Sequence, residues 1–269
     1  MSVLAAKASG NLTAAATFGL VDSTSYLNSE TGSEVLTTLY SDTRSSGFTT
    51  GVITIDGIGV KLSVRTGTTG TMSVSLYNAT LSADVAGTEV TINTADLPVA
   101  ATADLNGGWI FFKFAEPVLL LAATSYKVQA LTSSASQVSL FRDGTADNIS
   151  RYLRTTTEQA PAAGDDMIIA GEKTGAGAQT ALTVTMDQTA ATDYGAASTF
   201  LVTPSLAICQ GGTLQYGTTG AVNYVLRQSG NLIVYSGGTL NIGTVAAPMP
   251  RDSSAVLEFD CAADGGFGL

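Results

Sequence analysis

Short runs in which apolar and small polar side chains alternate recur along most of the chain. The clearest run spans residues 58–65, where isoleucine, valine and leucine alternate with glycine, lysine, serine and arginine. A period of two places successive side chains on opposite faces of a β-strand. This run therefore predicts a half-buried strand.

Similar runs, separated by clusters of Gly, Pro, Asn and Asp, predict further strands. They cover residues 72–76, 89–93, 109–114, 125–131 and 137–141. The turn chemistry of Gly67–Gly70, between the first two strands, predicts a hairpin. No run keeps the 3.6-residue period of a helix over three turns. The pattern predicts an all-β fold, and the strand spacing is typical of a β-sandwich.

The run from Trp109 to Phe114 carries aromatic bulk on both faces. This predicts either a central strand covered on two sides or a strand beside a ligand groove, and core packing is favoured. Trp109 is also a candidate ligand-binding residue, since its ring could stack on a sugar. Because proline cannot donate to a strand ladder, Glu116–Pro117 is predicted to turn the chain before residues 118–121.

Four segments are predicted along the chain. Residues 1–31 form an N-terminal arm, with a strand signal around 12–21, and residues 32–170 form the sandwich. The Gly- and Ala-rich stretch 171–180 is predicted to be a linker, and residues 181–269 form a second β-rich domain.

The second domain contains three brief strands that each open on a glycine. They are Gly212-Thr213-Leu214, Gly230-Asn231-Leu232 and Gly238-Thr239-Leu240. Repeated corner-and-strand units resemble the rungs of a β-helix, in which each coil buries its apolar positions against the next. The spacings are unequal, so ordinary hairpins of a small sandwich stay open as the alternative.

Composition narrows the classes of function. The 269 residues include no histidine, which removes the commonest general base, triad member and metal ligand. A net charge of -10 would repel phosphate backbones, so no nucleic-acid partner is predicted. Basic residues are scattered, and the pair Arg151 and Arg154 is interpreted as an exposed strand end. No cofactor is predicted.

The chain shows no sign of a membrane or export segment. Met1–Ala6 lacks the charged and apolar regions of a secretory signal, and no run reaches the ~20 apolar residues of a membrane span, so no membrane insertion is predicted. Cys209 and Cys261 are too few for a disulfide framework. Buried thiols are favoured over a bridge between them.

Paired carboxylates could in principle support glycoside hydrolysis. Candidates are Asp165 with Asp166, Asp143 with Asp147, and Glu116. Adjacent aspartates on a strand point to opposite faces, so the first pair is poorly placed for acid and base roles. Solvated loops are the favoured interpretation, and no catalytic residue is predicted.

One loop offers oxygen ligands suited to calcium. Asp143, Asp147 and Asn148 surround a glycine turn, and they are candidate metal ligands. The glutamate that would close an EF-hand loop is absent, and an Asx turn joining two strands is the simpler interpretation.

Two groups of segments carry a resemblance to known families. The first resembles jelly-roll sandwich domains of phage structural proteins and secreted carbohydrate-binding modules, and comprises Trp109–Phe114, Glu116–Leu120 and Ser125–Ala130. The second resembles repeats in tailed-phage virion proteins, and comprises Ser236–Gly243, Pro248–Arg251 and Phe259–Asp260. The resemblance implies a jelly-roll-like sandwich and a homo-oligomeric virion protein, with a trimer favoured.

The leading hypothesis is a non-enzymatic structural component of a bacteriophage virion, in the tail, fibre or capsid surface. Its expected partners are other virion proteins, with host attachment through a surface glycan left open. The alternative is a carbohydrate-binding or adhesive module of a bacterial surface protein. A polysaccharide depolymerase fragment is the third hypothesis.

Overall fold

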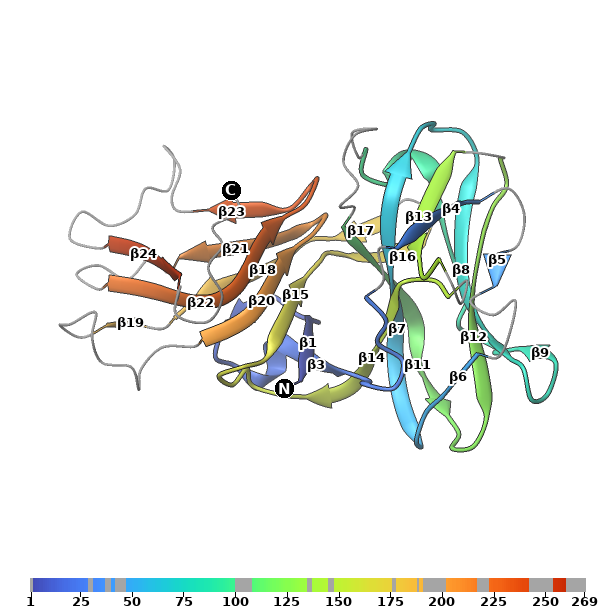
Figure 1. The fold of residues 1–269 in the computed structure, drawn as a ribbon, viewed down its shortest axis with the longest axis horizontal. Helices are drawn as coiled ribbons and strands as arrows, with labels where there is room; N and C mark the ends of the chain where they lie inside the picture. Colours follow the sequence, from blue (N-terminus) through green and yellow to red (C-terminus); the bar gives the residue numbers. More distant parts are fainter. Residues whose placement is uncertain are drawn as a thin grey trace.

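The protein is all-β, as the alternating pattern predicted. The computed structural model describes residues 2–28, 31–36, 40–41, 47–99, 108–134, 137–144, 148–175, 178–187, 189–190, 202–216, 223–241 and 254–259. Their regular elements are strands apart from two short 3₁₀ helices, η1 (Ala15–Thr17) and η2 (Thr94–Asp96). No helix of these residues is long and apolar enough to cross a membrane. Figure 1 shows two bodies of strands side by side.

Two facing sheets form the body on the right of Figure 1. The first has the order β4-β13-β7-β11, with bounds β4 (Gly32–Val35), β13 (Val138–Arg142), β7 (Ile53–Arg65) and β11 (Trp109–Leu120). The second has the order β10-β8-β12-β5, with β6 also on β12 and β9 on β8. Its bounds are β5 (Tyr40–Ser41), β6 (Phe48–Thr49), β8 (Thr71–Asn78), β9 (Ala83–Asp84), β10 (Val90–Asn93) and β12 (Ser125–Thr132).

The connections between these sheets follow jelly-roll topology. The chain passes from β4 to β5 and β6, back to β7, across to β8 and β10, back to β11, across to β12 and back to β13. Two interleaved Greek keys give this order of eight strand positions. The hairpin predicted at Gly67–Gly70 is therefore wrong, because that turn carries the chain between sheets and β7 does not pair with β8. The predicted sandwich is confirmed.

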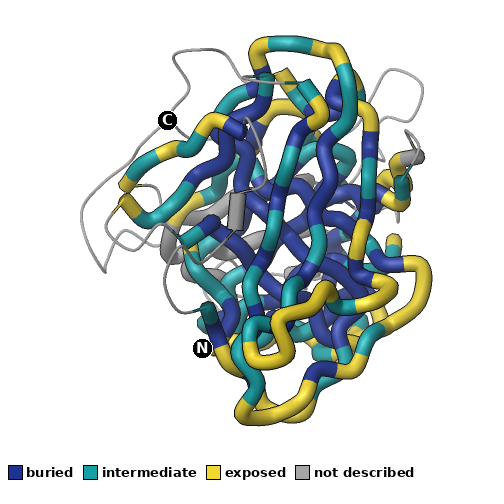
Figure 2. Tube along the Cα trace, turned by 90° about the vertical axis from the view of Figure 1, so that its right-hand side faces the viewer, coloured by how far each residue is buried: buried dark blue, intermediate teal, exposed yellow. Residues whose placement is uncertain are grey.

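The apolar residues that alternate in the sequence meet between the two sheets. Ile58, Val60 and Leu62 of β7 pack with Val74 and Leu76 of β8 in one buried cluster. Figure 2 shows these central strands as buried, with the exposed residues gathered in the loops. Burial of this face is the main source of the sandwich's stability.

Strand β11 is covered on both faces, as its aromatic pattern predicted. Ile110 and Phe112 face the sandwich core, whereas Trp109 and Phe111 belong to a second cluster on the other face. The turn expected at Pro117 does not form. Instead β11 continues to Leu120. Its register against β7 shifts between Lys113 and Val118, which is a β-bulge. Proline is tolerated at such a bulge on a strand edge, because no ladder hydrogen bond is needed there.

The first sheet continues beyond β7 into the left-hand body of Figure 1. Its next strands, in order, are β14 (Arg151–Glu158), β3 (Phe18–Val21), β1 (Val3–Ala6), β15 (Asp166–Ile169), β20 (Val202–Ile208) and β22 (Asn223–Val234), with β19 (Thr189–Ala190) and β24 (Ser254–Phe259) on β22. A separate sheet contains β2 (Gly10–Asn11), β18 (Leu182–Met186), β21 (Gly212–Tyr216) and β23 (Thr239–Asn241).

Parallel stacking in both of these sheets makes the left-hand body a β-solenoid. Strands β1, β15, β20 and β22 are parallel neighbours, and so are β2, β18, β21 and β23. Each coil contributes one strand to each sheet, and Leu4, Ile169, Leu206 and Leu214 are buried between the sheets. The second β-rich unit is therefore β-helix-like and is not a set of ordinary hairpins.

Glycine corners allow the coils to stack closely. Gly211 and Gly237 have φ of +72° and +81°, where a side chain would be strained. The next residues, Gly212 and Gly238, lie against the carbonyl oxygens of Ile169 and Ile208 in the preceding coils. Gly230, in contrast, lies inside β22 and forms no corner.

Substitution of a corner glycine should destabilise the solenoid. A Cβ on Gly212 would lie 2.2 Å from the carbonyl oxygen of Ile169, so the coils would have to separate. We expect Gly212→Ala to lower the free energy of unfolding by about 1–3 kcal/mol, measured by urea denaturation. Gly51→Ala is the control, since its Cβ would meet no atom within 4 Å. Equal unfolding midpoints for the two variants would contradict close stacking of the coils.

Two predicted segments are corrected. The predicted arm 1–31 is part of the solenoid. Strands β1 and β2 form its first coil, β3 pairs with β1, and Leu4 and Phe18 are fully buried. The predicted linker 171–180 instead contains β16 (Glu172–Gly175) and β17 (Ala178–Thr180), which extend the first sheet beyond β11. Partners distant in sequence, rather than local composition, order both segments.

Candidate functional site

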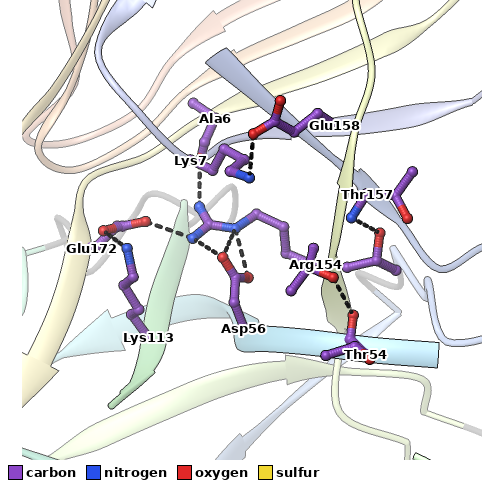
Figure 3. A network of polar contacts seen from close by, with 11 residues as sticks. Ala6, Lys7, Thr54, Asp56, Lys113, Arg154, Thr157, Glu158 and Glu172 are labelled. Carbon is purple, nitrogen blue, oxygen red and sulfur yellow. Dashed lines mark hydrogen bonds and ion pairs between the residues drawn. The ribbon is translucent and has the colours of Figure 1, made fainter. Parts of the chain in front are cut away.

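A buried charge network lies where the jelly roll meets the solenoid (Figure 3). Its centre is Arg154 of β14, whose side chain is 0% exposed. The Arg154 Nε donates to Asp56 Oδ1 at 2.9 Å, and Nη2 donates to Asp56 Oδ2 at 2.8 Å. Nη2 also lies 2.5 Å from Glu172 Oε1, and Nη1 donates to the carbonyl of Ala6. Lys113 Nζ completes the network, 2.9 Å from Glu172 Oε2.

The network connects both bodies of the fold. Asp56 lies on β7 of the jelly roll, Ala6 lies on the first solenoid coil, and Glu172 lies on β16. The Arg154 guanidinium also lies 3.9 Å from the centre of the Phe111 ring. Burial alone would lower the pKa of Arg154, but Asp56 and Glu172 raise it above its usual value. Arg154 therefore stays charged and fixes the two bodies together.

These residues show where prediction from the sequence failed. Arg151 and Arg154 were interpreted as an exposed strand end, yet they are 5% and 0% exposed. The available signal was the position of Arg154 next to Leu153 and Tyr152 in a chain with few charges, because a buried arginine needs a partner. Asp56 is likewise a charged residue inside a strand, β7, but nothing in the sequence around it links it to Arg154.

Trp109 lies in the core, and core packing was the interpretation that the sequence favoured. It is 2% exposed, and its ring centre lies 5.2 Å from that of Tyr152, in an edge-on arrangement, and 6.2 Å from that of Tyr26. Its backbone N–H donates to the sulfur of Cys209 at 3.3 Å. A ring enclosed in this way presents no open face to a sugar, so the structure gives no support to Trp109 as a ligand-binding residue.

Cys209 is a buried free thiol, as the sequence favoured. Burial raises its pKa to about 12, which leaves the sulfur protonated and unreactive at neutral pH. Cys261, the other cysteine, lies outside the described residues.

The candidate calcium loop closes a pair of short strand segments. The backbone N–H of Asp143 donates to the carbonyl of Asn148 at 2.9 Å, while Asp147 lies outside the described residues. Among the residues that the structure describes, no group of three or more His, Cys, Asp or Glu side chains could hold a metal ion.

The candidate glycosidase carboxylates that the structure describes have different surroundings, and Asp147 lies outside the described residues. Asp165 accepts hydrogen bonds from the backbone N–H groups of Ser2 and Ala162, and so orders the start of β1. Asp166 instead lines a surface groove, and Glu116 is exposed on β11. Asp165 precedes β15 and is 5% exposed, so its interpretation as a solvated loop residue is wrong, whereas Asp166 begins that strand.

Two surface grooves lie on the part of the chain that the structure describes. The junction groove, about 660 Å³ in volume, lies between β3, β14 and the start of β7, and Asp22, Asp166 and Tyr26 are among its lining residues. Burial raises the pKa of Asp166, although a backbone hydrogen bond from Ser205 opposes this.

The second groove, which we call the sheet groove, lies on the outer face of the jelly roll. Its volume is about 480 Å³, and β8, β12 and the β9–β10 segment form its walls. Ser75 and Tyr77 project from β8, Gln129 projects from β12, and Asp84 and Glu89 stand at the rim. Hydroxyl, amide and carboxylate groups beside one aromatic ring can bind a polyhydroxylated ligand.

Comparisons of the chain with protein-family models, with curated proteins and with solved structures give no significant match.

Proposed function

We propose that the protein is a non-enzymatic structural component of a bacteriophage virion that acts in particle assembly. The observation that supports this most is the continuous junction between the jelly roll and the solenoid, in which one strand ladder and the buried Arg154 network join the two bodies. A protein that acts through its shape needs such a junction, because forces between neighbouring subunits must pass through it.

The solenoid suits assembly for a physical reason. Each coil contacts its neighbours through parallel strands, and the body grows in one dimension. The hydroxyl-rich, sparsely charged surface depends little on salt for its contacts, because only 13% of residues are charged. We propose a homo-oligomer, with a trimer favoured, whose other partners are virion proteins.

Light scattering of the purified chain tests this proposal. We expect one folded oligomer of constant mass between low and high micromolar concentration, with a trimer as the favoured state. A folded monomer that does not associate with itself or with purified particles would contradict the proposal.

A carbohydrate-binding role is the second candidate, and the sheet groove is the observation that favours it. Tyr77 is partly exposed and presents its ring beside Ser75 and Gln129. Such a groove could serve host attachment within a virion or adhesion in a bacterial surface protein.

The groove predicts a specific effect of one substitution. Tyr77→Ala should weaken binding of a glycan found on an array by about tenfold, the equivalent of ~1.4 kcal/mol, without changing the unfolding midpoint. Leu119→Ala is the matched control, because Leu119 is 57% exposed and does not line this groove. Equal glycan affinity of the two variants, or no binding across the array, would remove the sheet groove as a binding site.

A further inference from the structure

A buried lysine lies against an exposed carboxamide where the jelly roll meets the solenoid. Lys61 of β7 is 1% exposed, and its Nζ donates to Asn28 Oδ1 at 3.3 Å. Three aromatic rings surround the amine: Trp109, Phe141 and Tyr235, with centres 5.7, 5.6 and 5.6 Å from Nζ. The hydrogen bond places the amine beside the Asn28 carboxamide, whose carbonyl carbon is a potential electrophile.

The surroundings of Lys61 favour a nucleophilic amine. Burial lowers the pKa of Lys61 to about 8, although Cys209 opposes this shift. At neutral pH on the order of a tenth of the molecules therefore carry a neutral amine, whose lone pair can attack a carbonyl carbon.

Tyr26 interacts with the Asn28 side chain. Burial is the larger effect on the pKa of Tyr26 and raises it to about 12, although a hydrogen bond from Asn28 lowers that pKa. Tyr26 therefore keeps its proton at neutral pH and helps to hold the Asn28 carboxamide in place. Asn28 itself is exposed, which gives a released ammonia molecule a path to solvent.

We propose that Lys61 and Asn28 join in an intramolecular isopeptide bond. Lys61 Nζ attacks Asn28 Cγ, a new N–C bond forms, and the C–Nδ2 bond breaks. The leaving nitrogen takes up the proton that Nζ loses and departs as ammonia. The reaction needs no oxidant or external reactant, and it links the N-terminal segment to β7. It goes beyond the proposed function and does not depend on it.

A second lysine–carboxamide pair provides an internal comparison. Lys173, 2% exposed, lies 2.5 Å from Gln179 Oε1 and 2.6 Å from the backbone oxygen of Asp96. Although burial lowers the pKa of Lys173, these two short hydrogen bonds stabilise its ammonium form. Lys173 is therefore expected to stay unlinked.

Intact-mass spectrometry of the full chain tests the proposal. We expect a mass about 17 Da below that of the sequence, the loss of one ammonia, and a fragment in which the peptides that contain Lys61 and Asn28 are joined. Lys61→Met and Asn28→Ala should restore the full mass, whereas Lys173→Met should keep the deficit. Asn28→Ala changes an exposed residue, so it is informative even where Lys61→Met fails to fold.

A succinimide at Asn28 would also release ammonia, and it is distinguishable. It would persist in Lys61→Met, and hydroxylamine would cleave it, whereas an isopeptide bond is absent from that variant and resists hydroxylamine. Full mass in the unmodified chain, a deficit that persists in Lys61→Met, or no joined fragment would each overturn the proposal.

Discussion

Arg154→Leu is expected to lower the free energy of unfolding by about 3–5 kcal/mol. The substitution leaves Asp56 and Glu172 buried without the guanidinium that contacts both carboxylates. It also removes the hydrogen bond to Ala6 that ties the first solenoid coil to the jelly roll. Urea denaturation followed by circular dichroism measures the effect.

Lys7→Leu is the matched control for this prediction. Lys7 forms an ion pair with Glu158 at 3.1 Å, but the two side chains are 21% and 51% exposed. Surface pairs of this kind contribute about 0–1 kcal/mol. Adding Asp56→Asn to Arg154→Leu should recover part of the loss, because Asp56 then no longer carries a buried charge without a partner, whereas Glu172 keeps its ion pair with Lys113. An unfolding midpoint for Arg154→Leu equal to that of Lys7→Leu would show that the network does not stabilise the junction.

Trp109→Ala is the second change with a large expected effect. Removing a fully enclosed indole should cost about 3–5 kcal/mol, because the ring packs against Tyr26 and Tyr152 and fills the space between the jelly roll and the solenoid. Urea or thermal unfolding measures the loss. Any glycan affinity should be unchanged in protein that remains folded, since Trp109 lies outside both grooves.

Tyr77→Ala is the opposite case and serves as the comparison for Trp109→Ala. It should change glycan affinity and leave stability within about 0.5 kcal/mol, as substitutions at partly exposed positions usually do. If Trp109→Ala weakened glycan binding while its unfolding midpoint stayed constant, the assignment of Trp109 to the core would be wrong.

Local alternation did not predict β4, β5, β6 or β9 of the jelly roll, but it was enough to predict β7, β8, β10, β11, β12 and β13. Each of these strands carries its own period-two pattern, and in β11 the aromatic residues on both faces predicted cover on both sides, as Phe111 and Phe112 show. The glycine corners at Gly212 and Gly238 likewise indicated stacked coils, since both lie against the preceding coil. These signals are local, so one sequence reveals them.

Pairing between distant segments could not be predicted in the same way. Strand β1 pairs with β15, so Leu4 lies beside Met167, and neither segment contains a feature that points to the other. The Arg154 network is a similar case, because Asp56 and Arg154 are 98 residues apart in the chain. Burial of a charge depends on a partner that only the fold provides, and composition around the charge does not identify that partner.

Electron cryo-microscopy of particles purified from the source of this chain tests the proposed role in a virion most directly. The account predicts repeated density for one rigid body, in which the jelly roll and the parallel-strand solenoid keep the orientation shown in Figure 1, arranged about a symmetry axis of the particle. Particles that lack this chain, or density in which the two bodies take up unrelated orientations, would contradict it.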